Sequence, residues 1–181
     1  MTVLIAYATV EGQTGKIARF VEKQARDAGL ETTLLEIGGS TGQEEFGGVD
    51  KVVLAASVHE RRHPKAFEAF VSNSRALLAE RQVLLLSVSL SAAFEDYRNE
   101  AQDYLDEMKL RTGLDPTAEL LVAGAVKPES YDDYAARVLR QVVLKGKAFV
   151  PTARDHEFTN WDELALTVAE FLEERAEIRT F

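Results

Sequence analysis

The chain has 181 residues, 46% of them hydrophobic and 28% charged, which fits one globular domain with a single core. Its formal net charge of −9 at pH 7 argues against nucleic acid or an anionic membrane as a partner. Because there is no cysteine, disulfides, thiolate metal sites and cysteine nucleophiles are excluded, and we expect no metal centre. The sequence shows neither a signal peptide nor a long apolar run, so we expect a soluble cytoplasmic protein without an integral membrane segment.

Short apolar runs alternate with longer segments of helical period. Residues 2–8 read TVLIAYA and are apolar on both faces, as in a buried parallel strand. The next segment ends at Gly29 and places one apolar stripe on a predicted helix, formed by Ile17, Phe20, Val21 and Ala25. Residues 31–37 and 50–57 are the next predicted strands, with a glycine-rich loop between them. A helix that begins near Pro64 and reaches Leu78 then leads to a fourth strand, 82–90.

The connection from that strand to the fifth, 118–126, is longer than an ordinary strand-to-helix connection. It contains residues at helical spacing, namely Tyr97, Ala101, Tyr104, Leu105 and Met108. Two further helices are expected, one over 131–142 and one that starts near Trp161. Strands alternating with helices predict a single three-layer α/β domain over residues 1–181, with a parallel sheet covered on both faces. Its ligand site should lie beyond the carboxyl ends of the strands.

The stretch YATVEGQT, residues 7–14, connects the first strand to the first helix. Its amides converge at a helix N-terminus, Gly12 permits close backbone approach, and Thr9 and Thr14 add hydroxyl donors. Many donors without a cation suit a phosphate held by hydrogen bonds, although a turn capped by threonines without any ligand fits the spacing equally well. The order of residues is that of neither a P-loop nor a dinucleotide fingerprint.

The segment LIAYATVEGQTGKIA resembles the FMN phosphate loop of flavodoxins, with Tyr7, Thr9, Gly12 and Thr14 at matching positions. VVLAASVHERRHPKAFEAFV, AGAV and FTNWDELALTVAEF are similar to the menaquinone-dependent protoporphyrinogen oxidase branch of that family. The resemblance implies a flavodoxin-like, doubly wound sheet in strand order 2-1-3-4-5, with an extended segment after strand four, and FMN as cofactor. It also implies an oxidoreductase that passes electrons from a reduced organic substrate to a quinone or another acceptor. In that branch the segment after strand four is basic, whereas SAAFEDYRNEAQDYLDEMKL here is acidic.

The loop SVHERRHP after the third strand gathers histidines and arginines in an otherwise acidic chain. A cation beside a flavin stabilises its anionic reduced form, so this loop predicts a flavin that accepts electrons. The alternative is a solvated patch in which Arg61 and Arg62 pair with Glu60 and neighbouring acids. His59 is our candidate proton acceptor, and Phe94 and Tyr97 are candidates to flank the ring. The expected cofactor-binding residues are Thr9, Val10, Glu11, Gly12, Gln13, Thr14, Ser57, Val58, His59, Glu60, Arg61, Ser89, Leu90, Phe94 and Tyr97.

The main alternative function is a flavodoxin-type electron carrier whose acidic surface docks on basic redox proteins. A phosphorelay receiver, which shares the strand order, would need acids after strand one and an aspartate after strand three, where the chain reads YATVE and AAS. The expected partners are therefore a small-molecule redox substrate or quinone, with a redox partner protein and a second copy of the chain as further candidates.

Overall fold

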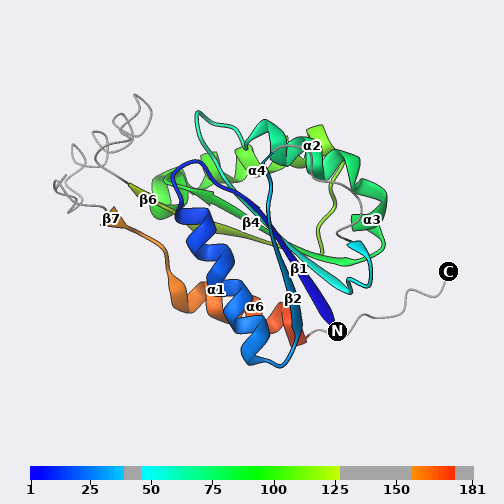
Figure 1. Cartoon of the computed structure of the whole chain (residues 1–181). Helices are drawn as coiled ribbons and strands as arrows, with labels where there is room; N and C mark the ends of the chain where they lie inside the picture. The colour runs from blue at the N-terminus through cyan, green and yellow to red at the C-terminus, as the bar shows by residue number, and fades with distance from the viewer. Residues whose placement is uncertain (39–45, 127–155, 174–181) are drawn as a thin grey trace.

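A computed structural model describes residues 1–38, 46–126 and 156–173 (Figure 1). In these ranges the strands are β1 (Thr2–Ala8), β2 (Glu31–Glu36), β3 (Lys51–Ser57), β4 (Gln82–Ser89), β5 (Ala118–Ala123), β6 (Ala125–Val126) and β7 (His156–Glu157). The α-helices are α1 (Gln13–Asp27), α2 (Lys65–Asn73), α3 (Arg75–Ala79), α4 (Arg98–Thr112) and α6 (Trp161–Glu173). Two short 3₁₀ turns, η2 (Ser91–Ala93) and η3 (Glu95–Tyr97), precede α4. The helix predicted over 131–142 lies outside the described residues.

The main sheet has five strands in the order β2-β1-β3-β4-β5, and each neighbouring pair is parallel. This confirms the predicted fold class and strand order. Parallel pairing requires every connection to cross from one end of the sheet to the other, so the carboxyl ends of all the strands lie at one edge. The short strands β6 and β7 pair antiparallel beyond that edge, with Ala125 opposite Glu157 and Val126 opposite His156.

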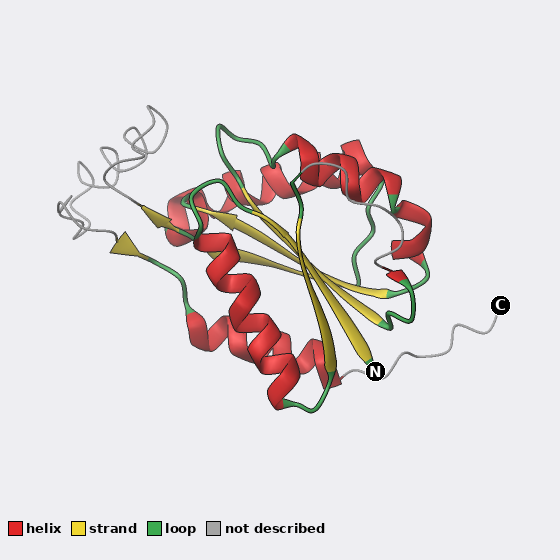
Figure 2. Ribbon diagram, in the orientation of Figure 1, coloured by secondary structure: helices red, strands yellow, loops and turns green. Residues whose placement is uncertain are grey.

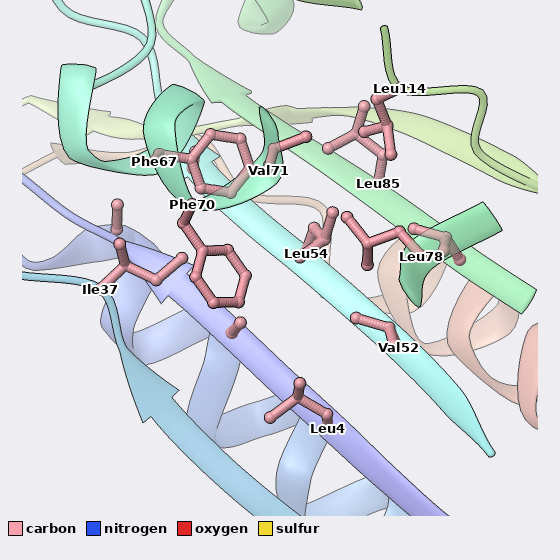
Figure 3. Close-up of a cluster of buried hydrophobic side chains, with 14 of the residues drawn as sticks. Leu4, Ile37, Val52, Leu54, Phe67, Phe70, Val71, Leu78, Leu85 and Leu114 are labelled. Atoms are coloured by element: carbon pink, nitrogen blue, oxygen red, sulfur yellow. The ribbon is translucent and has the colours of Figure 1, made fainter. Parts of the chain in front are cut away.

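Helices cover both faces of the sheet, as Figure 2 shows. Alternate strand residues point to opposite faces, which produces two separate cores. The first core packs β1, β3 and β4 against α2, α3 and α4, and Figure 3 shows Leu4, Leu54, Leu85, Phe67 and Phe70 among its side chains. The second core packs the other strand faces against α1 and α6. The nearly continuous apolar runs of β1 and β4 follow from this burial on both sides.

The crossovers differ from the prediction in one respect and agree with it in another. The helix expected from Pro64 to Leu78 is two helices, because Ser74, at φ −98° and ψ 7°, leaves the helical conformation between α2 and α3. The long connection after β4 is one crossover made of η2, η3 and α4. In that crossover Leu105 and Met108 are buried in the first core. No helix in the described ranges is long and apolar enough to cross a membrane.

Lys51, the first residue of β3, is buried at 2% exposure. Its ammonium group donates hydrogen bonds to the carbonyl of Phe171 and, at 3.2 Å, to the carbonyl of Leu172. Carbonyl groups in the last turn of a helix have no partner within the helix, so a cation at this position satisfies them and complements the helix dipole. Lys51 therefore joins the amino end of the sheet to the end of α6.

Candidate functional site

A cleft that is open to solvent lies beyond the carboxyl ends of β1, β3, β4 and β5. This is the edge at which ligands bind in doubly wound sheets. The cleft is lined by residues from the loops after these strands and from α4. They are Thr9, Val10, Glu11, Gln13, Thr14, Ser57, Val58, His59, Glu60, Val88, Ser89, Leu90, Ser91, Tyr104, Gly124, Ala125 and Val126.

One end of the cleft is the amino end of α1. Gly12, the residue before the helix, has φ 93° and provides no side-chain cap, and the first turn contains no acid. The Thr9 hydroxyl accepts a hydrogen bond from the Gly12 amide at 2.9 Å, which closes the loop into a turn. The first amides of a helix have no intrahelical acceptor and carry its partial positive charge, so this end of the cleft attracts an anion.

The Thr14 side chain supplies independent evidence for a ligand at this end. Thr14 is 1% exposed, and its hydroxyl has no hydrogen-bond partner among the described residues. A buried hydroxyl without a partner costs free energy, and such groups are therefore rare in folded proteins. Ser57 also lines the cleft, and its hydroxyl likewise has no hydrogen-bond partner among the described residues. A ligand with acceptor oxygens beside α1 would satisfy Thr14.

The other end of the cleft is mainly apolar. Val58 follows β3 and its amide donates to the carbonyl of Val88 at 2.7 Å, which fixes the start of the next loop. Leu90 and Val126 belong both to the cleft and to a small apolar cluster that includes Phe94 and Phe158. Such a surface suits the flat, largely apolar part of a ligand whose anionic end is held at α1.

Residues 59–62 form a tight hairpin at the rim of the cleft. The amide of His59 donates to the carbonyl of Arg62 at 2.9 Å, and the amide of Arg62 donates back to the carbonyl of His59 at 3.0 Å. The two residues between them, Glu60 and Arg61, have φ 47° and φ 65°. Side-chain-bearing residues rarely adopt this left-handed conformation, which costs roughly 1–2 kcal/mol for each. The hairpin turns His59 and Glu60 toward the cleft, as both are lining residues.

The arginines of this loop are held by acids outside the cleft. Glu68, on α2, is the common partner of Arg62, at 2.9 Å, and of Arg111 on α4, at 2.8 Å. Burial alone would raise the pKa of Glu68, but hydrogen bonds from Arg111 and Arg62 outweigh it and lower that pKa. Arg61 lies 3.8 Å from Glu100. Its guanidinium also covers the ring of Tyr104, which lines the cleft, with 5.6 Å between the guanidinium carbon and the ring centroid.

His63, the last residue of the basic segment, is part of the core. It is 2% exposed, stacks on Phe67 at 6.1 Å between ring centroids, and shares a 3.0 Å hydrogen bond with the Ser87 hydroxyl. Burial lowers the pKa of His63 to about 4, with the nearby Arg111 acting in the same direction and Glu68 opposing it. His63 is therefore neutral near pH 7 and contributes no positive charge to the loop.

The structure brings most of the predicted site residues together. The cleft is lined by Thr9, Val10, Glu11, Gln13, Thr14, Ser57, Val58, His59, Glu60, Ser89 and Leu90. Four predicted residues, Gly12, Arg61, Phe94 and Tyr97, are not among its lining residues. Phe94 packs edge-on against Phe158 at 5.4 Å, and Tyr97 lies against the same cluster. Their expected place beside the ligand remains a prediction.

Some residues that line the cleft are not predicted by the sequence. They are Val88, Ser91, Tyr104, Gly124, Ala125 and Val126. Tyr104 was expected on the apolar face of a helix, and it is 2% exposed, but its ring also reaches the cleft. The sequence pattern predicts Gly124 to Val126 as the end of the fifth strand, whereas the chain leaves the main sheet after Ala123 and pairs with β7. The glycine at 124 was the one local signal for this change of direction.

Comparison with known proteins places this arrangement in a family. A family model described as a flavodoxin domain matches residues 4–148. The chain belongs to the flavodoxin domain family. This flavodoxin domain is also 22% identical over 166 residues to protoporphyrinogen IX dehydrogenase [quinone] of Escherichia coli K12, covering 91% of both chains.

Solved flavodoxins share this fold. Oxidised flavodoxin 1 from Bacillus cereus superimposes with a TM-score of 0.60 at 16% identity, over 97% of this chain and all of that one. A mutant flavodoxin from Fusobacterium nucleatum, solved with flavin mononucleotide bound, gives a TM-score of 0.51 at 11% identity, over 96% and 94% of the two chains. At these identities the likeness shows the fold.

Proposed function

We propose that the chain is an FMN-binding oxidoreductase that passes electrons from a reduced organic substrate to a quinone or another acceptor. The observation that carries the FMN assignment is the buried hydroxyl of Thr14, which has no partner in the described structure, at the uncapped start of α1. In this proposal the FMN phosphate accepts hydrogen bonds from the first amides of α1 and from the hydroxyls of Thr9 and Thr14. Hydrogen bonds to an anion are stronger than those between neutral groups, so the loop needs no lysine or arginine.

The remaining lining residues fit the flavin ring. Val58, Leu90 and Val126 form apolar walls that would exclude water, and the Tyr104 ring closes the side formed by α4. FMN, when bound, supplies the two-electron redox chemistry that the protein's own side chains lack. The side chain best suited to hold or move a proton there is the His59 imidazole, because it lines the cleft and an imidazole can both donate and accept a proton.

The assignment as an oxidoreductase is supported by the relative from Escherichia coli, whose name describes a dehydrogenase of protoporphyrinogen IX that uses a quinone. The chain covers 91% of that protein, so the likeness extends over most of both chains. The acidic segment between Glu95 and Arg111 favours a reduced substrate that does not depend on a basic surface there for recognition.

An electron carrier is the second candidate, and the charges around the cleft favour it. Among the described residues the cleft is lined by Glu11 and Glu60 but by no lysine or arginine. Arg61 and Arg62 pair with the neighbouring acids Glu100 and Glu68, which fits the solvated-patch alternative, although the acid named there, Glu60, lines the cleft. Acidic surroundings destabilise an anionic reduced flavin and lower its potential, which is a property of carriers.

Anaerobic titration of the FMN-loaded protein distinguishes the two functions. An oxidoreductase of this kind takes up an electron pair in one step and turns over with a soluble quinone. A carrier takes up electrons one at a time, at two separate potentials, and reduces a quinone slowly or not at all. His59→Ala should slow quinone turnover in the first case and leave the single-electron steps unchanged in the second. A protein that binds no FMN at all would refute both assignments.

A further inference from the structure

One carboxylate outside the cleft accepts from donors on two helices, α1 and α6. Glu157, in β7, accepts a hydrogen bond from the Gln13 side-chain amide at 3.1 Å and one from the Trp161 indole at 2.7 Å. The ammonium group of Lys16 pairs with the same carboxylate. Gln13 and Lys16 belong to the first turn of α1, and Trp161 is the first residue of α6. The proposed function gives Glu157 no role, since it does not line the cleft.

A second set of contacts extends this junction to the main sheet. The Gln13 amide also donates to the Thr159 hydroxyl at 2.9 Å, and that hydroxyl donates to the carbonyl of Ala123 at 2.7 Å. Ala123 is the last residue of β5. The Gln13 side chain is thus held by two acceptors, one on β7 and one on the segment that follows it. In Figure 1 this segment leads from β7 to α6, which lies alongside α1.

The junction connects the two ends of the cleft. At one end, Gln13 and Thr14 begin α1 and line the cleft. At the other end, Ala125 and Val126 of β6 line it, and β6 pairs with β7, the strand that carries Glu157. We call residues 9–14 the anion loop. A change in the position of β7 would therefore displace both this loop and the apolar wall at Ala125 and Val126.

The junction also fixes Lys16, which lies two residues beyond Thr14. The backbone amide of Lys16 donates to the carbonyl of Gly12 at 3.1 Å. Its ammonium is engaged by Glu157 and lies 5.3 Å from the centroid of the Trp161 ring. Burial alone would raise the pKa of Glu157, but hydrogen bonds from Lys16, Trp161 and Gln13 lower it, so the carboxylate is ionised near neutral pH.

We propose that Glu157 is a positioning residue for the anion loop: it holds the first turn of α1 in the conformation that binds a phosphate and couples that turn to β6 and β7. The inference rests on the proposed function, because it takes the loop to be a phosphate site. Its physical basis is preorganisation, since a loop that is already ordered loses less conformational entropy when the ligand binds. Without Glu157, both Gln13 and Lys16 lose a partner, so a larger share of the order of the first turn must come from the ligand.

The test compares the affinities of FMN and riboflavin, which differ by the phosphate alone. Cofactor-free wild type, Glu157→Ala and Glu157→Gln are each titrated with both ligands. We expect Glu157→Ala to weaken FMN about tenfold more than riboflavin, as for the loss of one charge-assisted interaction. Glu157→Gln keeps an acceptor oxygen for Gln13 or Trp161 but no charge for Lys16. Its loss of FMN affinity should therefore lie between that of wild type and that of Glu157→Ala. Glu170→Ala, which removes an exposed acid from the same α6 helix that Trp161 begins, is the matched control and should change neither affinity.

A second measurement needs no flavin. Hydrogen exchange of the cofactor-free protein should become faster at the first amides of α1 in Glu157→Ala, with exchange in β1 and β3 unchanged. Equal losses of FMN and riboflavin affinity, with faster exchange throughout the fold, would show that Glu157 only stabilises the protein and would overturn the proposal. An unchanged affinity ratio with unchanged exchange in α1 would do the same. If wild type itself binds FMN no better than riboflavin, the phosphate site is wrong, and hydrogen exchange still decides whether Glu157 orders the loop.

Discussion

The Thr14 hydroxyl gives the most direct test of the anion site, because its removal should have opposite effects on the empty and the loaded protein. Thr14→Val replaces the hydroxyl by a methyl group of similar volume at a position that is 1% exposed. In the empty protein this removes a buried polar group without a partner in the described structure. Stability should then rise by up to about 1 kcal/mol, which for a chain of this size raises Tm by roughly 2–4 °C.

The loaded protein should lose affinity. A hydrogen bond from Thr14 to a phosphate oxygen is charge-assisted, and we expect its removal to cost roughly 1–2 kcal/mol of binding free energy. This corresponds to an FMN dissociation constant that is about 5- to 30-fold higher. Riboflavin has no phosphate, so its affinity should not change. Fluorescence titration of the cofactor-free protein with each ligand measures both constants, and calorimetry or thermal unfolding measures the stability.

Thr112→Val is a matched control for this substitution. Thr112 is also a buried threonine, but its hydroxyl donates to the carbonyl of Met108 at 2.9 Å within α4. Its removal should lower stability slightly and leave FMN binding unchanged. An FMN affinity that Thr14→Val leaves at the wild-type value would refute the assignment of Thr14 to the phosphate. A parallel loss of FMN and riboflavin would instead assign Thr14 to the packing of α1.

Three further substitutions test the supports around the cleft and the core. Glu68→Gln should destabilise the fold by roughly 1–3 kcal/mol at neutral pH in urea unfolding; because the folded-state pKa of Glu68 is lowered, the difference from wild type should shrink as the pH falls through that pKa. The pKa of His63 is about 4 in the folded protein instead of 6.5, so between these pH values the unfolded chain binds more protons than the folded one. The free energy of unfolding of wild type should therefore fall as the pH drops from 6.5 to 4. His63→Phe should flatten this dependence of stability on pH. Lys51→Met removes the donor to the last carbonyls of α6 and should cost roughly 1–3 kcal/mol in thermal unfolding, whereas Lys65→Met, at an exposed position, should have little effect.

The strands could be predicted because the fold buries both of their faces. A run such as TVLIAYA is apolar without alternation, which a strand covered by helices on two sides requires, and β1 has the predicted bounds. The helix after β3 was predicted less well. Its apolar face continues from Phe67 to Leu78 at helical spacing, so periodicity gives no indication of the break at Ser74. That break depends on the backbone of one residue.

The loops of the site could be predicted from topology. Once the strands are parallel, the residues that follow β1, β3 and β4 meet at one edge, and these loops supplied the predicted residues that line the cleft. The Glu157 junction could not be predicted in this way. Its hydrogen bond to Gln13 joins residues 144 positions apart. The sequence around Gln13 and around Glu157 gives no indication that the two side chains meet. Tyr104 was missed because one face of a helix can be buried in the core and still reach a neighbouring cleft.

The basic loop shows why a count of charges does not predict a local potential. In the sequence, His59, Arg61, Arg62 and His63 form one positive cluster. In the structure a two-residue turn separates them: His59 faces the cleft, the arginines face acids on α2 and α4, and His63 is neutral in the core. The potential at a flavin in the cleft would then be set by one imidazole and by the carboxylates of Glu11 and Glu60, together with the dipole of α1 at the phosphate end. In the proposed oxidoreductase, this lining predicts that proton transfer at His59 matters more than a high potential. Quinone turnover by His59→Ala should therefore separate the two functions better than the potential alone.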